Sequence, residues 1–314
     1  LRPERLKIVV FIVFLTQTTW PYLHNQCACT SFFFFRVSTM NRGMFSCDKT
    51  KALLHDKPPQ FSFLHCNIRS LRRHHDDLIN FLSILDHNFS IICLSETWLT
   101  QVDGNLFDLP GYISEHSYRG NQRSGGSAIF VNSSIAYTRR LDLSFRNLLC
   151  ESVWLEFDRN VLPLNNRPTI LASICRSPSS SYSDFCSQLE EILNLLTNEN
   201  KNIIICNDIN IKILPPSCQL CSAYINCLFS YGFSSLIDVP TRCDTAGSCT
   251  LRDHIFSSST SDYTTGVIDY SITDHYPLFF VLGTGKRAQH RQYTKNSFNE
   301  ALFARKVHDT CWNN

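Results

Sequence analysis

Two short runs made only of apolar residues place the strongest limit on the fold of this chain. They are Ile91-Ile92-Cys93-Leu94 and Ile203-Ile204-Ile205-Cys206, and their length and composition are typical of buried strands. A strand that is apolar along both of its faces belongs to a sheet that is covered on both sides. We therefore expect sheets in this chain to be covered on both faces.

Segments with helical periodicity alternate with these runs. Apolar residues recur every three or four positions in residues 71–85 and 182–196, and a further helix is expected around residues 221–231, ending at Gly232. Alternation of strands and helices predicts the α/β fold class. Other strands are expected at residues 61–66, 127–131, 153–157, 169–174, 236–239, 254–256 and 276–282.

Composition limits the class of protein. The chain has 314 residues, 43% of them hydrophobic, which is enough for one large α/β domain or two small ones. The formal net charge of +2 gives no strong electrostatic sign of a nucleic-acid partner, although one face can be basic while the total is not. The 15 cysteines are odd in number and irregularly spaced, so we expect reduced, intracellular thiols rather than a disulfide framework.

The two ends of the chain differ from its middle. Residues 8–15 form an apolar run after basic residues, which is the outline of a signal peptide, but the run is too short to cross a bilayer. An unstructured leader over residues 1–57 is expected in preference to secretion, and no membrane partner is expected. A single domain is predicted over residues 58–283, followed by a basic linker over residues 284–314.

Polar residues stand where the predicted core strands end. In layered α/β proteins such strand ends share one edge of the sheet, and that edge is the usual place for a binding or catalytic site. Three of these residues are carboxylates and none is a cysteine, so the set suits a hard divalent cation such as Mg²⁺ better than zinc. The residues are Asn67, Glu96, Arg176, Asp208 and Asn210 after strands, with Asp274 and His275 ahead of the last strand.

Each of these residues also has an ordinary structural interpretation. Asn67 is compatible with a turn, Glu96 with a helix cap, and Asp208 and Asn210 with an Asx-turn. Asp253 beside a histidine is compatible with a simple loop pair. The recurrence of such groups at successive strand ends is what favours a site.

In this arrangement the chain resembles the endonuclease/exonuclease/phosphatase superfamily, and specifically the endonuclease domain of LINE-type (non-LTR) retrotransposons. The resemblance covers about residues 58–283 and rests on seven motifs in the family's order. The motifs are Cys66-Asn67-Ile68-Arg69-Ser70-Leu71, Ser95-Glu96-Thr97-Trp98-Leu99, Arg123-Ser124-Gly125-Gly126-Ser127-Ala128-Ile129-Phe130-Val131, Cys175-Arg176-Ser177-Pro178-Ser179-Ser180-Ser181, Asn207-Asp208-Ile209-Asn210, Asp253-His254-Ile255-Phe256 and Thr273-Asp274-His275.

The resemblance implies a two-sheet α/β sandwich flanked by helices, with a deoxyribonuclease I-like fold. It implies a nuclease that uses Mg²⁺ (or Mn²⁺) to nick a DNA phosphodiester and leaves a 3′-hydroxyl that primes reverse transcription. It also implies DNA as partner, together with the element's RNA and reverse transcriptase, and an intracellular place of action, in the nucleus where the DNA is cut.

The resemblance also implies roles for individual residues. Glu96, Asn67 and Asp274 are implied on the metal side, with Asn67 also close to the phosphate. Asp208 is implied to orient or deprotonate the attacking water.

Four further roles complete the implied site. Asn210 is implied to hold the scissile phosphate, and His275, oriented by Asp253, to bind and protonate a phosphate oxygen or act as base. Arg176 and Arg69 are the predicted phosphate- and DNA-binding cations.

The chain departs from the family pattern at two places. Cys175 stands where a tyrosine is usual, and loss of one such hydrogen-bond donor typically costs about a hundredfold or more in rate. Asn207 and Ile209 replace Gly and Phe around Asp208. Two alternatives to an active nuclease follow: a catalytically decayed relic that at most binds DNA, and a phosphatase of the superfamily that acts on a small phosphoester.

Overall fold

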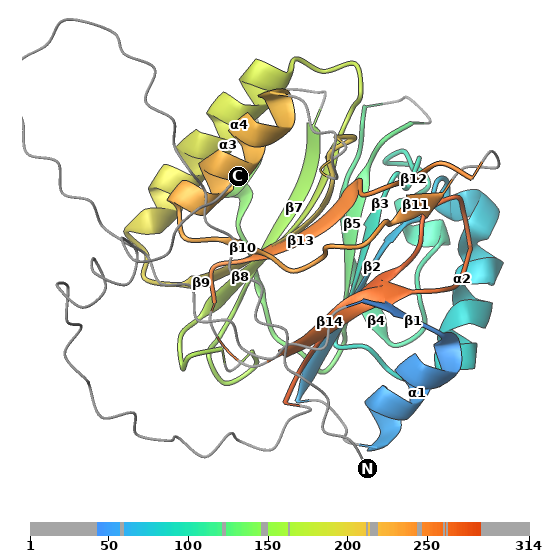
Figure 1. The fold of residues 1–314 in the computed structure, drawn as a ribbon. Coiled ribbons are helices and arrows are strands. Elements are labelled where there is room, and N and C mark those ends of the chain that lie inside the picture. Colours follow the sequence, from blue (N-terminus) through green and yellow to red (C-terminus); the bar gives the residue numbers. More distant parts are fainter. Residues whose placement is uncertain are drawn as a thin grey trace, which may run out of the picture. The chain divides into compact units, whose positions relative to one another are not determined.

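Two β-sheets packed face to face form the centre of the molecule, and a pair of helices covers the outer face of each (Figure 1). The computed structural model describes residues 43–56, 60–120, 124–145, 150–162, 164–211, 213, 219–243, 247–259, 261 and 263–283. The expected fold class, an α/β two-sheet sandwich flanked by helices, is confirmed.

The first sheet has seven strands in the order β1-β14-β15-β2-β3-β5-β4. β2 and β3 run parallel, and β2 and β3 pair antiparallel with β15 and β5 respectively. The carboxyl ends of β2 and β3 therefore lie at the same edge as the amino ends of β15 and β5. The strands are β1 (Met44–Phe45), β2 (Phe61–Asn67), β3 (Ile91–Ser95), β4 (Tyr112–Ser117), β5 (Ser127–Asn132), β14 (Tyr263–Ile268) and β15 (Leu278–Leu282).

The second sheet has six strands in the order β10-β13-β9-β8-β7-β6. β8 and β9 are parallel, and β13 runs antiparallel to β9. A separate two-stranded hairpin joins β11 (Arg242–Cys243) to β12 (Cys249–Thr250). The six strands are β6 (Thr138–Arg139), β7 (Cys150–Phe157), β8 (Thr169–Arg176), β9 (Asn202–Asp208), β10 (Ser234–Ser235) and β13 (Asp253–Ser257).

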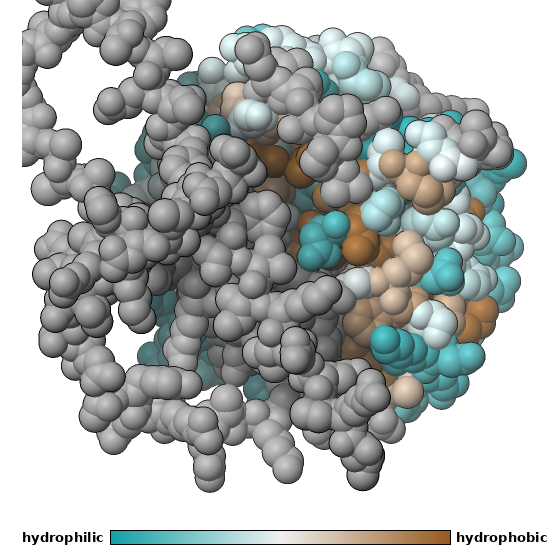
Figure 2. All heavy atoms as spheres, viewed as in Figure 1, coloured by the Kyte–Doolittle hydropathy of each residue, from teal (hydrophilic) through white to brown (hydrophobic). Residues whose placement is uncertain are grey.

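The helices cover the sheets through apolar stripes. On the first sheet lie α1 (Cys47–Asp56) and α2 (Leu71–Leu85), and on the second lie α3 (Tyr182–Thr197) and α4 (Gln219–Ser230). Hydrophilic residues follow the right-hand rim of Figure 2, where Figure 1 places α2, so its polar side faces solvent. Short 3₁₀ turns occur at Gly104–Leu106 and Leu141–Leu143. Within the described residues, no helix is long and apolar enough to cross a bilayer.

The fold extends further toward the amino terminus than the sequence predicts. β1 pairs with β14, and Phe45 packs edge-on against Phe279 with ring centroids 5.1 Å apart. Leu54 of α1 is also buried. Residues 43–56 therefore belong to the domain and correct the expected leader, whereas residues 1–42 and the expected linker over 284–314 lie outside the described residues.

Two further expectations need correction. Residues 236–239 do not form a strand: β10 ends at Ser235, and Pro240 lacks the backbone N–H that a longer strand would need. Cys243 and Cys249 are joined by a disulfide across the β11–β12 hairpin, although nine other described cysteines form no disulfide, as expected.

Candidate active site

One end of the space between the two sheets is lined by polar side chains. Side chains alternate along a strand, so on β2 the same face carries Phe63, His65 and Asn67, and on β9 it carries Cys206 and then Asp208. The interior of the sandwich thus changes from apolar to polar toward the edge where these strands end. Of the residues that the sequence places after separate strands, the structure brings Asn67, Asp208 and Asn210 into direct contact at this edge.

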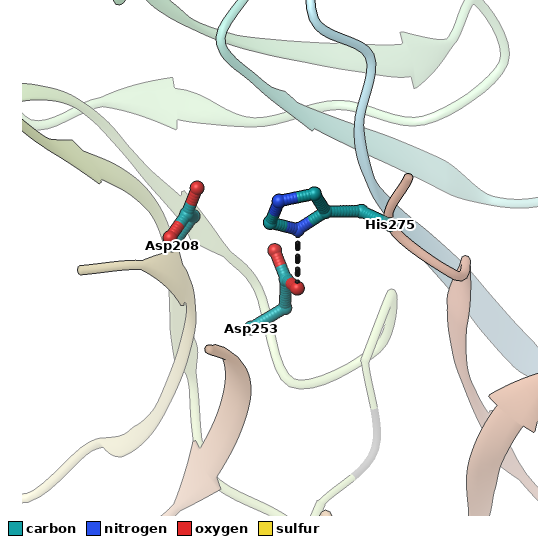
Figure 3. Close-up of side chains that lie close together, drawn as sticks. All are labelled: Asp208, Asp253 and His275. Atoms are coloured by element: carbon teal, nitrogen blue, oxygen red, sulfur yellow. Dashed lines mark hydrogen bonds and ion pairs between the residues drawn. The ribbon is translucent and has the colours of Figure 1, made fainter. Parts of the chain in front are cut away.

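Asp208, Asp253 and His275 form a compact buried group at this edge (Figure 3). Asp253 lies directly opposite Asp208 in the β9–β13 pair. Each of the three residues offers one ligand-type atom, and these atoms all lie within 4.8 Å of one another. His275 Nδ1 and Asp253 Oδ2 are 2.7 Å apart, so the carboxylate orients the imidazole, which is the contact that the family resemblance implies.

Thr241 fixes the carboxylate of this pair. Its hydroxyl donates to Asp253 Oδ2 at 2.8 Å and accepts from the Asp253 backbone N–H at 3.0 Å. The sequence gives no sign of Thr241, because only the loop leading into β11 brings it to Asp253.

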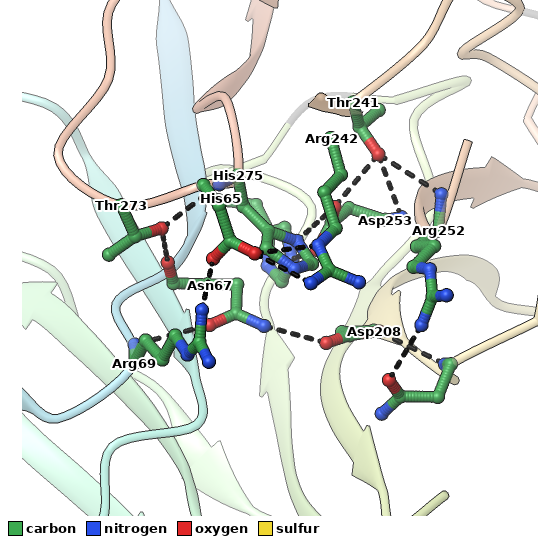
Figure 4. A network of polar contacts seen from close by, with 12 residues as sticks. His65, Asn67, Arg69, Asp208, Thr241, Arg242, Arg252, Asp253, Thr273 and His275 are labelled. Atoms are coloured by element: carbon green, nitrogen blue, oxygen red, sulfur yellow. Dashed lines mark hydrogen bonds and ion pairs between the residues drawn. The ribbon is translucent and has the colours of Figure 1, made fainter. Parts of the chain in front are cut away.

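Thr273 and Asn67 connect the histidine to the second carboxylate (Figure 4). The Thr273 hydroxyl donates to the Asn67 carbonyl at 2.9 Å and accepts from the His275 backbone N–H at 3.1 Å. The Asn67 amide donates to Asp208 Oδ2 at 2.7 Å, and its Oδ1 accepts from the Arg69 N–H at 3.1 Å. Asn67 is thereby locked between the two sheets.

Glu96 follows β3 in a strained conformation. Its φ of 56° lies in the left-handed region, which costs a residue with a side chain about 1–2 kcal/mol. The carboxylate accepts from Trp98 Nε1 at 2.5 Å and the Gly125 N–H at 3.2 Å. The Cys175 thiol, whose pKa is raised well above its ordinary value by burial, donates to Glu96 Oε1 at 3.5 Å. Strain of this kind accumulates at functional sites.

Asn210 closes a tight turn beside Asp208. Its backbone N–H donates to Asp208 Oδ1 at 3.0 Å, and its φ of 57° is one that Asn tolerates. The Asx-turn interpretation of these two residues is therefore correct. The turn places both side chains at the polar edge of the sandwich. Arg252 Nη1 approaches Asn210 Oδ1 at 3.4 Å.

Arg176 faces away from this group. Its guanidinium donates to the Ser177 carbonyl at 2.8 Å and lies over the rings of Tyr182 and Phe185 beneath α3. Only its carbonyl reaches the site, where it accepts from Asn210 Nδ2 at 2.9 Å. The structure does not support the predicted phosphate-binding role for this side chain.

Asp274 is held by two arginines rather than by the buried group. Arg69 Nη1 donates to its Oδ1 at 2.8 Å, and Arg242 Nε donates to its Oδ2 at 2.7 Å. Burial raises the pKa of Asp274, but the hydrogen bond from Arg242, the charge of His275 and the hydrogen bond from Arg69 outweigh it, so the net pKa is lowered. The metal-side role of Asp274 stays a prediction.

The two central groups have pKa values close to neutrality. Burial, with the charges of Asp253 and Glu96, raises the pKa of Asp208 to about 7. Burial lowers the pKa of His275, but the charge and hydrogen bond of Asp253 and the charge of Asp208 outweigh it and raise it to about 8. Perturbed groups of this kind at one edge identify a candidate for proton transfer.

These pKa values predict how stability changes with pH in metal-free protein. Both groups bind their protons more tightly when folded, so their stabilisation is lost as pH rises through about 7 for Asp208 and about 8 for His275. Buried histidines have the opposite effect, because folding lowers their pKa, as it does for His254, to about 4. Their effect makes stability rise with pH, but only up to their ordinary pKa of 6.5. We therefore expect the melting temperature of protein in a chelator to fall by a few degrees between about pH 6.5 and 8.5.

The melting experiment has an internal control. Adding Mg²⁺ at about pH 8.5 should reverse the fall, because a ligand that binds only the folded state stabilises it. The variant Asp208→Asn should show a flatter pH profile in chelator. A melting temperature that rises over this range in the metal-free protein would contradict the assignment.

The buried group fits a hard divalent cation. In the described part of the chain, the hydrogen-bond donors to Asp208 are the uncharged amides of Asn67 and Asn210, so no cation hydrogen-bonds to this carboxylate, which also faces Asp253. Carboxylate oxygens with one imidazole suit Mg²⁺ or Mn²⁺. The ligand-type atoms of Asp208, Asp253 and His275 are close enough to hold such an ion, which would neutralise phosphate charge and activate water. Because Asp253 already binds His275 Nδ1, the predicted ligands Glu96 and Asn67, at the same edge, are the set that leaves His275 free for proton transfer.

The fold and the site together define a hydrolytic α/β enzyme. Residues 64–275 match the sequence profile of the Endonuclease/Exonuclease/phosphatase family. The chain belongs to this family of phosphoesterases and nucleases. A sequence search of curated proteins found no match.

Solved structures show the same fold at low sequence identity. The endonuclease domain of TRAS1, a telomere-specific non-LTR retrotransposon, superposes with a TM-score of 0.54 at 14% identity over 72% of this chain and 100% of that chain. The 3′ phosphatase NExo from Neisseria, bound to a product DNA hairpin, gives 0.52 at 15% identity over 71% and 99%. A mannosyl-6-phosphatase of Bacteroides thetaiotaomicron gives 0.51 at 16% identity over 70% and 98%.

Proposed function

We propose that this protein is a metal-dependent DNA endonuclease of a LINE-type retrotransposon. In this role it nicks a phosphodiester with Mg²⁺ or Mn²⁺ and leaves a 3′-hydroxyl that primes reverse transcription of the element's RNA. The observation that carries the proposal is Asp208 beside the Asp253–His275 pair at the polar end of the sandwich. The family motifs in their order, together with the fold shared with a retrotransposon endonuclease, support the finer assignment.

The side chains supply the steps of phosphodiester hydrolysis. Asp208, with a pKa of about 7, accepts the proton of the attacking water, since a base is most effective when its pKa is near the working pH. His275, with a pKa of about 8, carries a proton at neutral pH and binds or protonates a phosphate oxygen. Asn210, fixed by its turn, holds the phosphate in line.

Cations beside the site would hold the nucleic acid. The Arg69 side chain is 52% exposed, and Arg242 lies with it on Asp274 at the site's rim. Arg252 reaches the same edge from the second sheet. Arginines at a rim bind the phosphate backbone without reading sequence, and DNA as substrate places the point of action in the nucleus.

The second candidate function is hydrolysis of a small phosphoester, as in the mannosyl-6-phosphatase with the same fold. Small ligands are usually held in concave pockets. Two cavities, of about 460 and 370 Å³, are lined by residues near α3 and α2, and neither includes a site residue. The exposed Arg69 beside the site favours an extended phosphate backbone such as that of DNA.

A nicking assay on supercoiled plasmid with Mg²⁺ tests the proposal. Wild-type protein should convert the plasmid to open circles, and Glu96→Gln should be at least about a hundredfold slower because it removes a charge at the site. Equal nicking by both proteins would attribute the activity to a contaminant. Release of phosphate from small esters without nicking would select the phosphatase, and DNA binding without either reaction would select the decayed relic.

A further inference from the structure

His65 and Asp253 face each other with buried polar atoms that lack partners. Neither ring nitrogen of His65 has a hydrogen-bond partner among the described residues, and the same holds for Asp253 Oδ1. Both residues are almost fully buried. His65 Nε2 lies 4.0 Å from Asp253 Oδ1, just beyond hydrogen-bond length.

The strand geometry explains why His65 lies there. It occupies the face of β2 that points into the sandwich, two residues before Asn67, so it lies behind the site rather than in it. Asp253 Oδ2 is taken by His275 and Thr241. The carboxylate therefore faces two imidazoles, with His275 on its Oδ2 and His65 4.0 Å from its Oδ1 (Figure 4).

The surroundings of the two His65 ring nitrogens favour one tautomer of the imidazole. A neutral imidazole carries one N–H, on either Nδ1 or Nε2. On Nδ1 that proton would meet no acceptor among the described residues, whereas on Nε2 it points at an ionised oxygen that lacks a donor. A shift of about 1 Å completes the bond, and a buried carboxylate oxygen without a donor is costly.

We propose that His65 carries its proton on Nε2 and donates it to Asp253 Oδ1, and so acts as a positioning residue for the Asp253–His275 pair. With His65 on one oxygen and Thr241 and His275 on the other, the carboxylate cannot rotate. The His275 ring is then held with its second nitrogen toward the scissile phosphate. The catalytic part of this inference rests on the proposed function, whereas the hydrogen bond itself does not.

Three variants separate hydrogen bonding from packing. His65→Gln places an amide N–H near the position of Nε2, His65→Asn places one near Nδ1, and His65→Met keeps the bulk without a donor. We expect kcat for plasmid nicking to stay within about threefold of wild type for Gln and to fall about ten- to hundredfold for Asn and Met, the rate equivalent of one hydrogen bond to a charged group. KM should change little in all three.

If His65 serves packing rather than hydrogen bonding, the three variants should rank differently in rate and melting temperature. If His65 only fills space, Met should match or exceed Gln in both rate and melting temperature. Equal rates for Gln, Asn and Met would overturn the proposal.

Nitrogen-15 NMR of the imidazoles tests the hydrogen bond without any activity. The signals that disappear in His65→Gln identify the ring, and its proton should be on Nε2 at neutral pH, with a downfield shift that is lost in Asp253→Asn. A proton on Nδ1, or a shift insensitive to Asp253→Asn, would overturn the proposal. Because this measurement needs no substrate, it decides the inference even if the protein proves not to cut DNA.

Discussion

Replacing Asp208 by Asn should lower the nicking rate about 10²–10⁴-fold and at the same time stabilise the metal-free protein. The rate falls because an amide cannot accept a proton from water, and a positioned general base contributes a factor of this size. Stability rises because burial and the charges of Asp253 and Glu96 disfavour the ionised Asp208, as its pKa of about 7 shows. Active sites commonly retain groups that are unfavourable for folding.

Single-turnover nicking rates and thermal melts at about pH 8 measure the two effects. Asp76→Asn is the matched control, since that side chain is 96% exposed on α2 and should change neither quantity. A variant at Asp208 that nicks at the wild-type rate would remove this residue from the mechanism. A variant that loses both activity and stability would mean that Asp208 serves the fold rather than the chemistry.

The sequence predicted the edge at which the site forms better than the contacts within it. Asn67 ends β2 of the first sheet and Asp208 ends β9 of the second. The strand ends could be predicted from the sequence, whereas the contact at 2.7 Å between the two side chains depends on how the sheets pack face to face. Asp253 and His275 were found through the family motifs, and the structure pairs them as that resemblance implies.

The parts that the sequence did not predict depend on long-range packing. Thr241 and His65 acquire their partners only when the loop before β11 and the face of β2 close on Asp253. The strand Tyr263–Ile268 has no alternating pattern, and it becomes a fully buried strand because β1 and β15 lie on either side of it. Arg176 has the right position in a motif, but strand alternation turns its charge to the opposite face.

A buried ion pair beside the site carries the second large prediction. Arg119 donates from Nε and Nη2 to the two oxygens of Glu151, at 2.7 and 2.6 Å, and both side chains are buried. The Gly126 N–H adds a third hydrogen bond at 3.1 Å. A Cβ on Gly125 would collide with the Arg119 guanidinium, and the φ of 65° at Gly125 also disfavours any other residue. The pair is therefore built into the turn that supplies a donor to Glu96.

Removing only the cation of this pair should strongly lower the free energy of unfolding. Arg119→Met leaves the Glu151 carboxylate buried with one backbone donor among the described residues, and breaking a buried pair in this way costs about 3–5 kcal/mol. We expect this loss in the free energy of unfolding measured with urea. Arg139→Met, which breaks a more exposed pair with Glu115, is the control and should cost about 1 kcal/mol or less.

The double variant Arg119→Met, Glu151→Met separates the energy of the pair from the cost of the orphaned charge. If the loss in the single variant comes from the unpaired carboxylate, the second substitution should recover most of it, since an apolar pair of similar volume is often as stable as a buried ion pair. The coupling energy of the double-mutant cycle would then be large and favourable. If the two losses simply add, the stabilisation comes from packing around the turn. In either case the nicking rate of the double variant should fall. The Gly125-Gly126 turn, which donates to Glu96, would lose both the guanidinium packed against Gly125 and the carboxylate that accepts from Gly126.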